Sequence, residues 1–218
     1  MVSLNYNTDT YPFRTLLENK LNYFELDKIH LDEMFSYKNK FERSNDQSTH
    51  YHRKFYELAR EEKFKQIYTA FIIETIKPYF ENKPIVYQTI PTFRLHFPGN
   101  IAVGEYHRDR DYRDNEWASQ VKEVNFFLPF TKASGTNTIW VESEEGKEDF
   151  YPIISDYGKV IAWDGCNLLH GNKTNEESST RVSMDFRVML YENYLPSTIG
   201  SINMASKFEI GGYYSLME

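Results

Sequence analysis

The chain has 218 residues, of which 40% are hydrophobic and 17% aromatic, a composition that predicts a folded protein and excludes a disordered one. Its 32 acidic and 25 basic residues give a formal net charge of -7 without a long basic run, which argues against nucleic acid as a partner. A single cysteine excludes an internal disulfide framework, and no apolar run approaches the length of a membrane span. We therefore expect a cytoplasmic protein that neither binds nucleic acid nor enters a membrane.

Residues 1–82 are expected to form a helical cover. Apolar residues recur at intervals of three and four in FRTLLENKLNYFELDKIHLDEMF (13–35) and in YHRKFYELAREEKFKQIYTAFIIETIKPYF (51–80), which is the spacing of a buried helix face. The candidates for one buried stripe are Phe55, Leu58, Ile67, Phe71 and Ile72.

Residues 83–192 have the sequence pattern of a strand-rich core. Short runs rich in Val, Ile, Phe, Tyr and Thr, broken by Pro, Gly and Asn, predict about eight strands. Helices followed by strands indicate an α+β fold in which the helices cover one face of a rolled sheet. No repeat or linker interrupts the sequence, so we expect one domain over residues 1–218, with 193–218 as a C-terminal tail that carries no motif.

Two of the expected strands carry their polar side chains at one parity, in RVSMDFRV (181–188) and in TFRLHF (92–97). The polar residues are Arg181, Ser183, Asp185 and Arg187 in the first strand and Thr92, Arg94 and His96 in the second. An antiparallel sheet with one face in water gives the same alternation. Several basic side chains on one sheet are better explained by a polar cavity inside a barrel, which would bind anions.

His107, Asp109 and His170 are the candidate metal ligands. One residue separates His107 from Asp109, so both side chains project to the same side of a strand, and His170 follows the apolar run KVIAWDGCNLL (159–169). Two imidazoles and one carboxylate on one face of an octahedron leave three sites open, as in non-haem Fe(II) oxygenases. A lone histidine is more often structural, and Asp111 is an alternative carboxylate if the chain leaves the strand early.

Arg181 and Ser183 are the candidate clamp for an organic acid. Arg181 follows His170 by eleven residues (181 - 170), and Ser183 lies two residues further along the same expected strand. A guanidinium binds a carboxylate through two parallel hydrogen bonds, and a hydroxyl beside it can donate a third. This pair would hold the distal carboxylate of 2-oxoglutarate, with Arg94 as the alternative anchor. Arg187, about 20 Å further along the strand, is expected to be an ion-pair partner of Asp185 or of an acid on a neighbouring strand.

The set H-R-D…H-G-N…R-V-S-M-D-F-R resembles the 2-oxoglutarate/Fe(II)-dependent oxygenases of the double-stranded β-helix (jelly-roll) fold. The segments EVNFFLPFT, NTIWVES and TRVSMDFRV are similar to small proteins of this kind from streptomycin-type and other carbohydrate biosynthesis clusters. The resemblance implies a jelly roll with the N-terminal helices packed outside its sheet. It implies iron ligands at His107, Asp109 and His170, 2-oxoglutarate contacts at Arg181, Ser183, Asn125 and Thr138, and substrate or cavity positions at Arg94, His96 and Trp140. Core positions are the alternative for Trp140 and the expectation for Trp163, rather than a platform for substrate.

The implied activity is that of a non-haem Fe(II)/2-oxoglutarate-dependent dioxygenase. It would use O2 to hydroxylate a small polar metabolite of a biosynthetic pathway, such as a sugar, an aminocyclitol or an amino-acid-like compound. Desaturation, ring closure and epimerisation stay open, as do a monomer and a homodimer. One alternative is a cupin-like metal- or sugar-binding module without oxygenase activity, which has no need of a carboxylate clamp. Another is a jelly-roll isomerase, which needs a His and Tyr acid–base pair instead of the three ligands.

Overall fold

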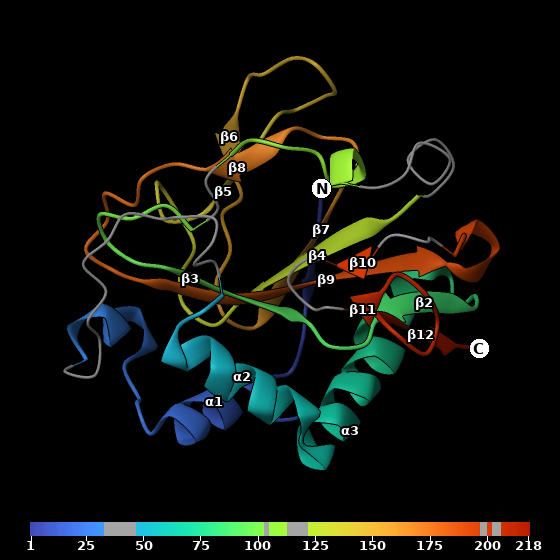
Figure 1. The fold of residues 1–218 in the computed structure, drawn as a ribbon, viewed down its shortest axis with the longest axis horizontal. Helices are drawn as coiled ribbons and strands as arrows, with labels where there is room; N and C mark the ends of the chain where they lie inside the picture. The colour runs from blue at the N-terminus through green and yellow to red at the C-terminus, as the bar shows by residue number, and fades with distance from the viewer. Residues whose placement is uncertain (33–46, 103–104, 113–121, 197–199, 202–205) are drawn as a thin grey trace.

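The computed structural model describes residues 1–32, 47–102, 105–112, 122–196, 200–201 and 206–218. Its helical elements are α1 (Phe13–Leu21), η1 (Leu26–Leu31), α2 (His50–Arg60), α3 (Glu62–Phe71), η3 (Ile72–Ile76), η4 (Lys77–Phe80), η5 (Asp109–Tyr112) and η6 (Tyr191–Asn193). The strands are β1 (Val2–Asn5), β2 (Ile85–Gln88), β3 (Thr92–His96), β4 (Val124–Pro129), β5 (Ile139–Val141), β6 (Tyr151–Pro152), β7 (Lys159–Trp163), β8 (His170–Asn172), β9 (Arg181–Leu190), β10 (Gly200–Ser201), β11 (Ser206–Lys207) and β12 (Tyr214–Met217). The expected α+β arrangement is confirmed (Figure 1).

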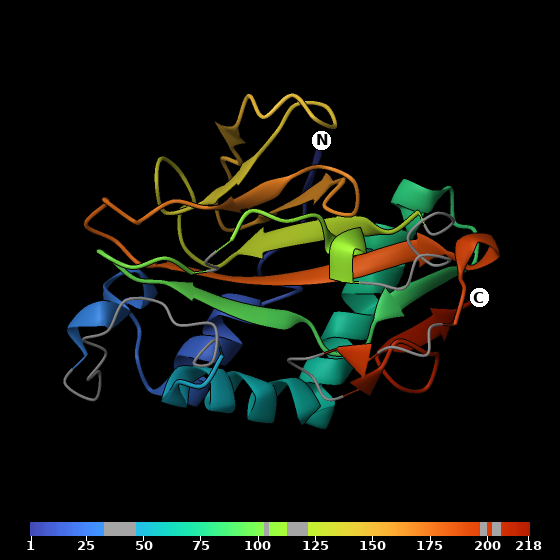
Figure 2. The same cartoon turned by 45° about the horizontal axis from the view of Figure 1, so that its top comes forward.

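A seven-stranded antiparallel sheet is built around β9. Its order is β1-β7-β4-β9-β2-β12, and β3 pairs with β9 beside β2, so the ten-residue β9 joins three strands. A three-stranded sheet, β6-β5-β8, lies on one side of the large sheet, and α1 and α2 lie on the other side (Figure 2). A separate two-stranded sheet pairs β10 with β11.

The two faces of β9 have different environments, as its alternation predicts. Val182, Met184, Phe186 and Val188 belong to a large apolar core that also contains buried residues of α1, α2 and α3. Phe186 stacks on Phe126 of β4, with ring centroids 5.3 Å apart, and meets the edges of two aromatic rings of α3. The opposite parity, from Arg181 to Arg187, is left for polar chemistry on the face away from these helices.

The helical segments are more broken than their apolar spacing predicts. The first helix ends at Leu21 because Asn22 adopts a left-handed conformation, with φ of 55°, and Leu26–Leu31 forms a separate turn of helix. The second segment is divided at Glu61, whose backbone is extended between α2 and α3. Within the described ranges, no helix combines the length and the apolar character that a membrane crossing requires.

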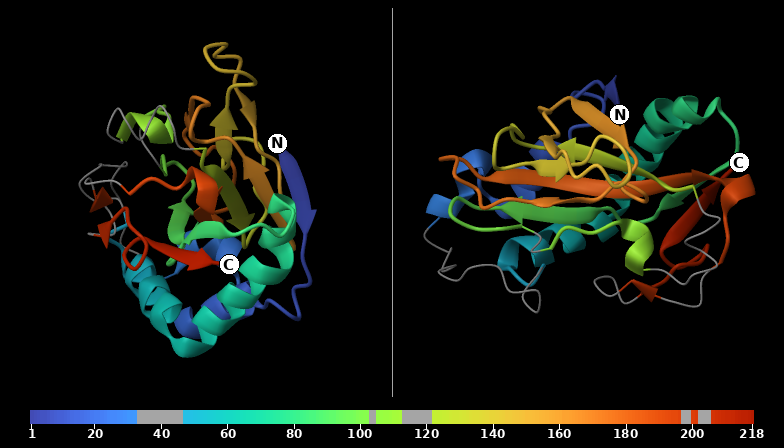
Figure 3. Two further views of the ribbon diagram at one scale, coloured as in Figure 1. Left: turned by 90° about the vertical axis from the view of Figure 1, so that its right-hand side faces the viewer. Right: turned by 90° about the horizontal axis from the view of Figure 1, so that it is seen from above.

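The large sheet takes its two edge strands from segments in which no strand was predicted. β1, within the expected helical cover, pairs with β7, and β12, within the expected tail, pairs with β2 (Figure 3). Both strands have only four residues. Such short segments acquire their structure from the strand beside them, because four residues carry little periodicity of their own.

Candidate metal centre

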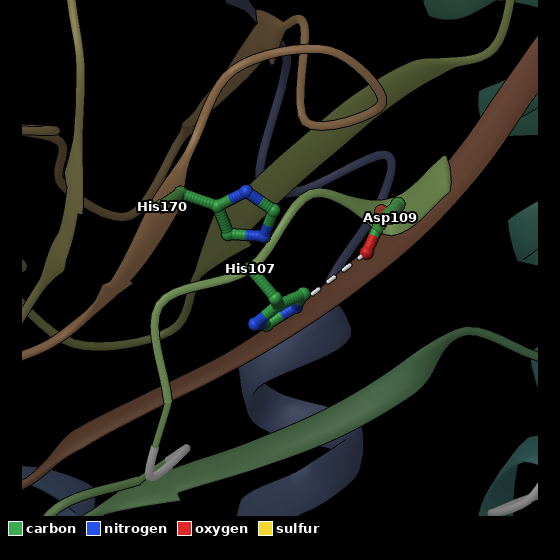
Figure 4. A group of neighbouring side chains, drawn as sticks. All are labelled: His107, Asp109 and His170. Carbon is green, nitrogen blue, oxygen red and sulfur yellow. Dashed lines mark ion pairs between the residues drawn. The ribbon is translucent and has the colours of Figure 1, made fainter. Parts of the chain in front are cut away.

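His107, Asp109 and His170 come together although they lie on different local structures. His107 and His170, the first residue of β8, form an isolated antiparallel bridge with reciprocal backbone hydrogen bonds of 2.9 and 3.0 Å. Asp109 begins the short helix η5, so the His-x-Asp pair does not continue as a strand. One possible ligand atom from each residue lies within 4.8 Å of the others, and Figure 4 shows the three side chains converging. The structure therefore brings together the three residues predicted to bind metal.

Backbone carbonyls orient both imidazole rings. The Nδ1 of His107 lies 2.9 Å from the carbonyl oxygen of Glu105, and the Nδ1 of His170 lies 2.9 Å from that of Leu168. A carbonyl oxygen only accepts, so in each neutral ring Nδ1 carries the proton and Nε2 keeps its lone pair. That is the tautomer of a metal-binding histidine whose other nitrogen is fixed by the protein.

The protonation states also suit a cation. Burial lowers the pKa of His170 to about 4, although the charge of Asp109 opposes this shift. Burial also opposes ionisation of Asp109, but the charge of Arg187 outweighs it and holds the pKa of Asp109 well below its usual value. At neutral pH the group therefore contains a carboxylate and a neutral His170 imidazole, both in their ligating forms.

Arg187 and Asn125 hold the second oxygen of Asp109. The Nε and Nη2 of Arg187 each lie 2.9 Å from Oδ2, and the Asn125 amide donates to Oδ2 over 2.7 Å. Arg187 faces Asn125 across β9 and β4, and a Cβ added at Gly165 would lie 2.6 Å from the Asn125 amide nitrogen. Arg187 thus forms the expected ion pair, but its main partner is the Asp109 carboxylate of the metal group. Asn125, predicted to contact 2-oxoglutarate, contacts that same carboxylate.

Arg181 and Ser183 are buried with polar atoms that lack a partner. The side chains are 1% and 0% exposed, and neither Nε of Arg181 nor Oγ of Ser183 has a hydrogen-bond partner among the described residues. The guanidinium carbon lies 5.5 Å from the centre of the Phe127 ring. Burial lowers the pKa of Arg181 to about 10, which leaves it charged at neutral pH. A buried cation with an unused donor, beside an unused hydroxyl, has the chemistry to hold an anion.

Comparison with known proteins assigns the chain to a family. No protein-family model matches the sequence. Over 172 residues, however, the chain is 37% identical to the streptomycin biosynthesis protein StrG of Streptomyces griseus. The aligned region is 79% of this chain and 78% of StrG. The chain belongs to the StrG family.

Two solved structures share the fold of this StrG-family chain. One is the non-haem alpha-ketoglutarate-dependent carbocyclase SnoK from nogalamycin biosynthesis, with a TM-score of 0.59, 11% identity, and coverage of 100% of this chain and 91% of SnoK. The other is EctD from S. alaskensis in its apo form, with a TM-score of 0.51, 15% identity, and coverage of 89% of this chain and 74% of EctD. At these identities the likeness concerns the fold alone.

The remaining predicted site residues of this StrG-family chain lie in different places. Arg94 lies opposite Ser183 and pairs with Asp185, its Nε 3.5 Å from Oδ1, so it is on the polar face of the large sheet. The Thr138 hydroxyl donates to the carbonyl of Ile153 over 2.6 Å. Trp140 lies outside the site. In β5 it faces Gly171, whereas its neighbour Val141 faces His170, so the indole projects from the other side of the small sheet.

Trp163 lies in an apolar core cluster, as expected, and also contacts His170, while Glu142 is a neighbour of the site that was not predicted. The indole of Trp163 meets His170 edge-on, with centroids 4.7 Å apart, and its buried Nε1 has no partner among the described residues. Glu142, fully buried, accepts the backbone N–H of Leu169 over 2.6 Å and pairs with Arg108, which fixes the segment before His170. Trp163 is opposite Asn125, a register that the sequence does not show because the run KVIAW is apolar at both parities after its first residue.

Asp111 does not replace Asp109. Its Oδ2 accepts the backbone N–H of Arg108 over 3.1 Å, and the residue is exposed. Asp109, in contrast, is 6% exposed and lies against both histidines. The structure therefore favours Asp109 of the two carboxylates considered.

His96 is a buried structural residue that should make the protein sensitive to acid. Its ring nitrogens lie 3.0 Å from the carbonyl oxygens of Asn137 and Asn100, two acceptors that favour the protonated ring, but burial, reinforced by the charge of Arg181, outweighs them and lowers its pKa to about 3. Because an unfolded histidine has a pKa of about 6.5, the unfolded state binds the extra proton between these values. The His96 contribution to stability is complete above pH 6.5 and is lost as the pH falls toward 3.

We predict that this single group lowers the free energy of unfolding by about 2 kcal/mol between pH 6.5 and pH 5. Urea unfolding at a series of pH values measures this loss. In His96→Gln the slope of stability against pH should be smaller than in the wild type by nearly one proton over this window. An unchanged slope in His96→Gln would show that His96 is protonated in the folded protein.

Proposed function

We propose that this StrG-family chain is a non-haem Fe(II)- and 2-oxoglutarate-dependent oxygenase acting on a small polar metabolite. The observation that carries the proposal is the combination of the three converging ligands with the unpartnered Arg181 and Ser183. Arg181, Ser183 and Arg187 share one parity of β9, and Arg187 contacts Asp109, so the clamp and the metal group lie on one face of the sheet. We also propose that the two sheets form a double-stranded β-helix.

The donor set fits Fe(II). Two imidazoles whose Nδ1 atoms face backbone carbonyls, together with one carboxylate, are the ligands of the facial triad, and three such ligands leave three of six octahedral positions open. Two of these positions are needed for the keto acid and one for O2. A structural zinc site would instead be closed by a fourth protein ligand, and within the described residues only these three form such a group.

The unpartnered polar atoms fit the distal carboxylate of 2-oxoglutarate. A planar guanidinium can donate two parallel hydrogen bonds to a carboxylate, and the Ser183 hydroxyl can donate a third. The Phe127 ring beside Arg181 limits access of water, which strengthens the attraction between the two charges. A cupin-like module would have to leave this buried cation without a function, and for that reason we favour the oxygenase.

Each residue then has a definite task. His107, Asp109 and His170 would hold the iron, Arg181 and Ser183 would fix 2-oxoglutarate, and Trp163 would keep water from the edge of His170. With both bound, the centre would supply oxidising power, converting O2 and 2-oxoglutarate to succinate and CO2 while one oxygen atom enters a substrate C–H bond. The relationship to a streptomycin biosynthesis protein supports a sugar or an aminocyclitol as the substrate class.

The proposal predicts a difference between two neighbouring aspartates. Asp109→Asn, which keeps the size of the side chain, should weaken anaerobic Fe(II) binding by more than about 100-fold, the upper end of the cost of losing an outer-shell partner. Asp111→Asn is the matched control and should bind Fe(II) like the wild type. Calorimetry measures both affinities, and circular dichroism verifies folding. Equal affinities in the two variants would remove Asp109 from the ligand set.

A second prediction concerns the clamp. Arg181→Lys should weaken 2-oxoglutarate binding to the metal-loaded protein by about 10- to 100-fold, because an ammonium group cannot reproduce the planar fork. Fe(II) affinity should be unchanged, since Arg181 is not a ligand. The control is Arg14→Lys, in a surface pair 2.7 Å from Glu18. An unaltered affinity for 2-oxoglutarate in Arg181→Lys would move the anchor elsewhere, with Arg94 as the first candidate.

A further inference from the structure

Asp109 has one oxygen that is saturated by the protein. Its Oδ2 accepts two hydrogen bonds, from Nε of Arg187 and from the amide of Asn125, and Nη2 of Arg187 forms an ion pair with the same oxygen. A carboxylate oxygen has about two lone-pair positions, so Oδ2 has no capacity left for a cation. Oδ1 instead lies 3.7 Å from Nε2 of His107, on the side where the two imidazoles converge. Asp109 can therefore offer only one oxygen to a metal.

Arg187 is itself held by a second layer of buried groups. Its Nη1 donates to the Tyr213 hydroxyl over 2.7 Å, and its Nε lies 3.7 Å from Oε2 of Glu123. The other Glu123 oxygen, Oε1, accepts the Tyr214 hydroxyl over 2.5 Å. Glu123 is 2% exposed and Tyr214 is 0% exposed. The Arg187 guanidinium thus lies between the buried carboxyl groups of Asp109 and Glu123. The Tyr213 hydroxyl helps to fix the guanidinium, and the Tyr214 hydroxyl helps to fix Glu123.

The two tyrosines belong to the region around β12, where the sequence shows no motif. Tyr214 begins β12 opposite Gln88 of β2, and the backbone carbonyl of Tyr213 accepts the N–H of Thr89. Both rings are part of an apolar cluster with Phe208, Val86, Met189 and Cys166. Cys166 follows Gly165, whose carbonyl accepts the backbone N–H of Asp109 over 3.0 Å. The β12 region therefore packs directly behind the segment that positions Asp109.

We propose that Tyr213 and Tyr214 are positioning residues for the metal centre, acting through Arg187 and Glu123. They keep Arg187 on Oδ2, so that Asp109 would offer only Oδ1 to a metal. With one oxygen from Asp109, the three ligands would leave room for a keto acid and O2. A second oxygen from Asp109 would take part of that room. The inference rests on the proposed function and assigns to β12 a part in it.

The test compares variants in which a tyrosine hydroxyl with one or another hydrogen-bond partner is removed. Tyr213→Phe, Tyr214→Phe and their combination remove the hydroxyls that contact Arg187 and Glu123. Tyr194→Phe is the control, because its hydroxyl accepts the backbone N–H of Ile210 in the same region. Glu123→Gln removes the charge that lies beside Nε of Arg187. It is the second variant if the double substitution fails to fold. Circular dichroism and thermal unfolding establish that each variant is folded.

Two readouts separate positioning from a general structural role. The first is the visible absorption of bound Co(II), which responds to the number of ligands, and the second is calorimetric binding of 2-oxoglutarate to the metal-loaded protein without O2. We expect the double variant and Glu123→Gln to change the Co(II) spectrum and to bind 2-oxoglutarate about tenfold more weakly, with Tyr194→Phe unchanged. Lower thermal stability with a wild-type spectrum and wild-type 2-oxoglutarate affinity would overturn the inference. Failure of the wild type to bind 2-oxoglutarate would instead overturn the proposed function.

Discussion

The buried ion pair of Asp109 and Arg187 is the interaction on which the site depends. A carboxylate that is 6% exposed is costly unless cations and hydrogen-bond donors compensate it, and here Arg187 and Asn125 do so, with the two histidines packed beside it. The supporting groups come from β9, from β4, from the bridge at His107 and from the start of β8. Elements far apart in the sequence must therefore be assembled correctly before the carboxylate can be buried.

Strand β9 links this electrostatic requirement to the hydrophobic core. One parity of the strand is apolar and packs on the helices, with Phe186 against Phe126, while the other parity carries the groups that surround Asp109 and the anion site. Because a strand alternates strictly, fixing Phe186 in the core also fixes Arg187 on the opposite face. The contacts that stabilise the fold thus also set the relative positions of Arg181, Ser183 and Arg187. A shift of the β9 register by one residue would bury their polar side chains among the helices.

The sequence was informative where chemistry depends on local alternation and uninformative where it depends on crossing segments. The parity of RVSMDFRV placed Arg181 and Ser183 on one face, and the order of His107, Asp109 and His170 identified three residues that converge. The rise per residue of a strand predicted that Arg187 lies far from Arg181. Nothing in the sequence shows that η5 crosses the Arg187 end of β9 and brings Asp109 there.

The strands β1 and β12 were missed because pairing with β7 and β2 creates them. Trp163 is in the core as expected and Trp140 is not, since the side to which each faces depends on the register with β4 and β8.

The central claim is that the three ligands hold Fe(II) with positions left open for 2-oxoglutarate while Arg181 fixes its far end. The most direct measurement is the visible spectrum of the wild-type protein under anaerobic conditions, first with Fe(II) alone and then with 2-oxoglutarate added. We predict that the second addition produces the weak charge-transfer band of a bidentate keto-acid chelate. Binding of Fe(II) with no such band on addition of 2-oxoglutarate would contradict the account and would favour a metal-binding module without oxygen chemistry.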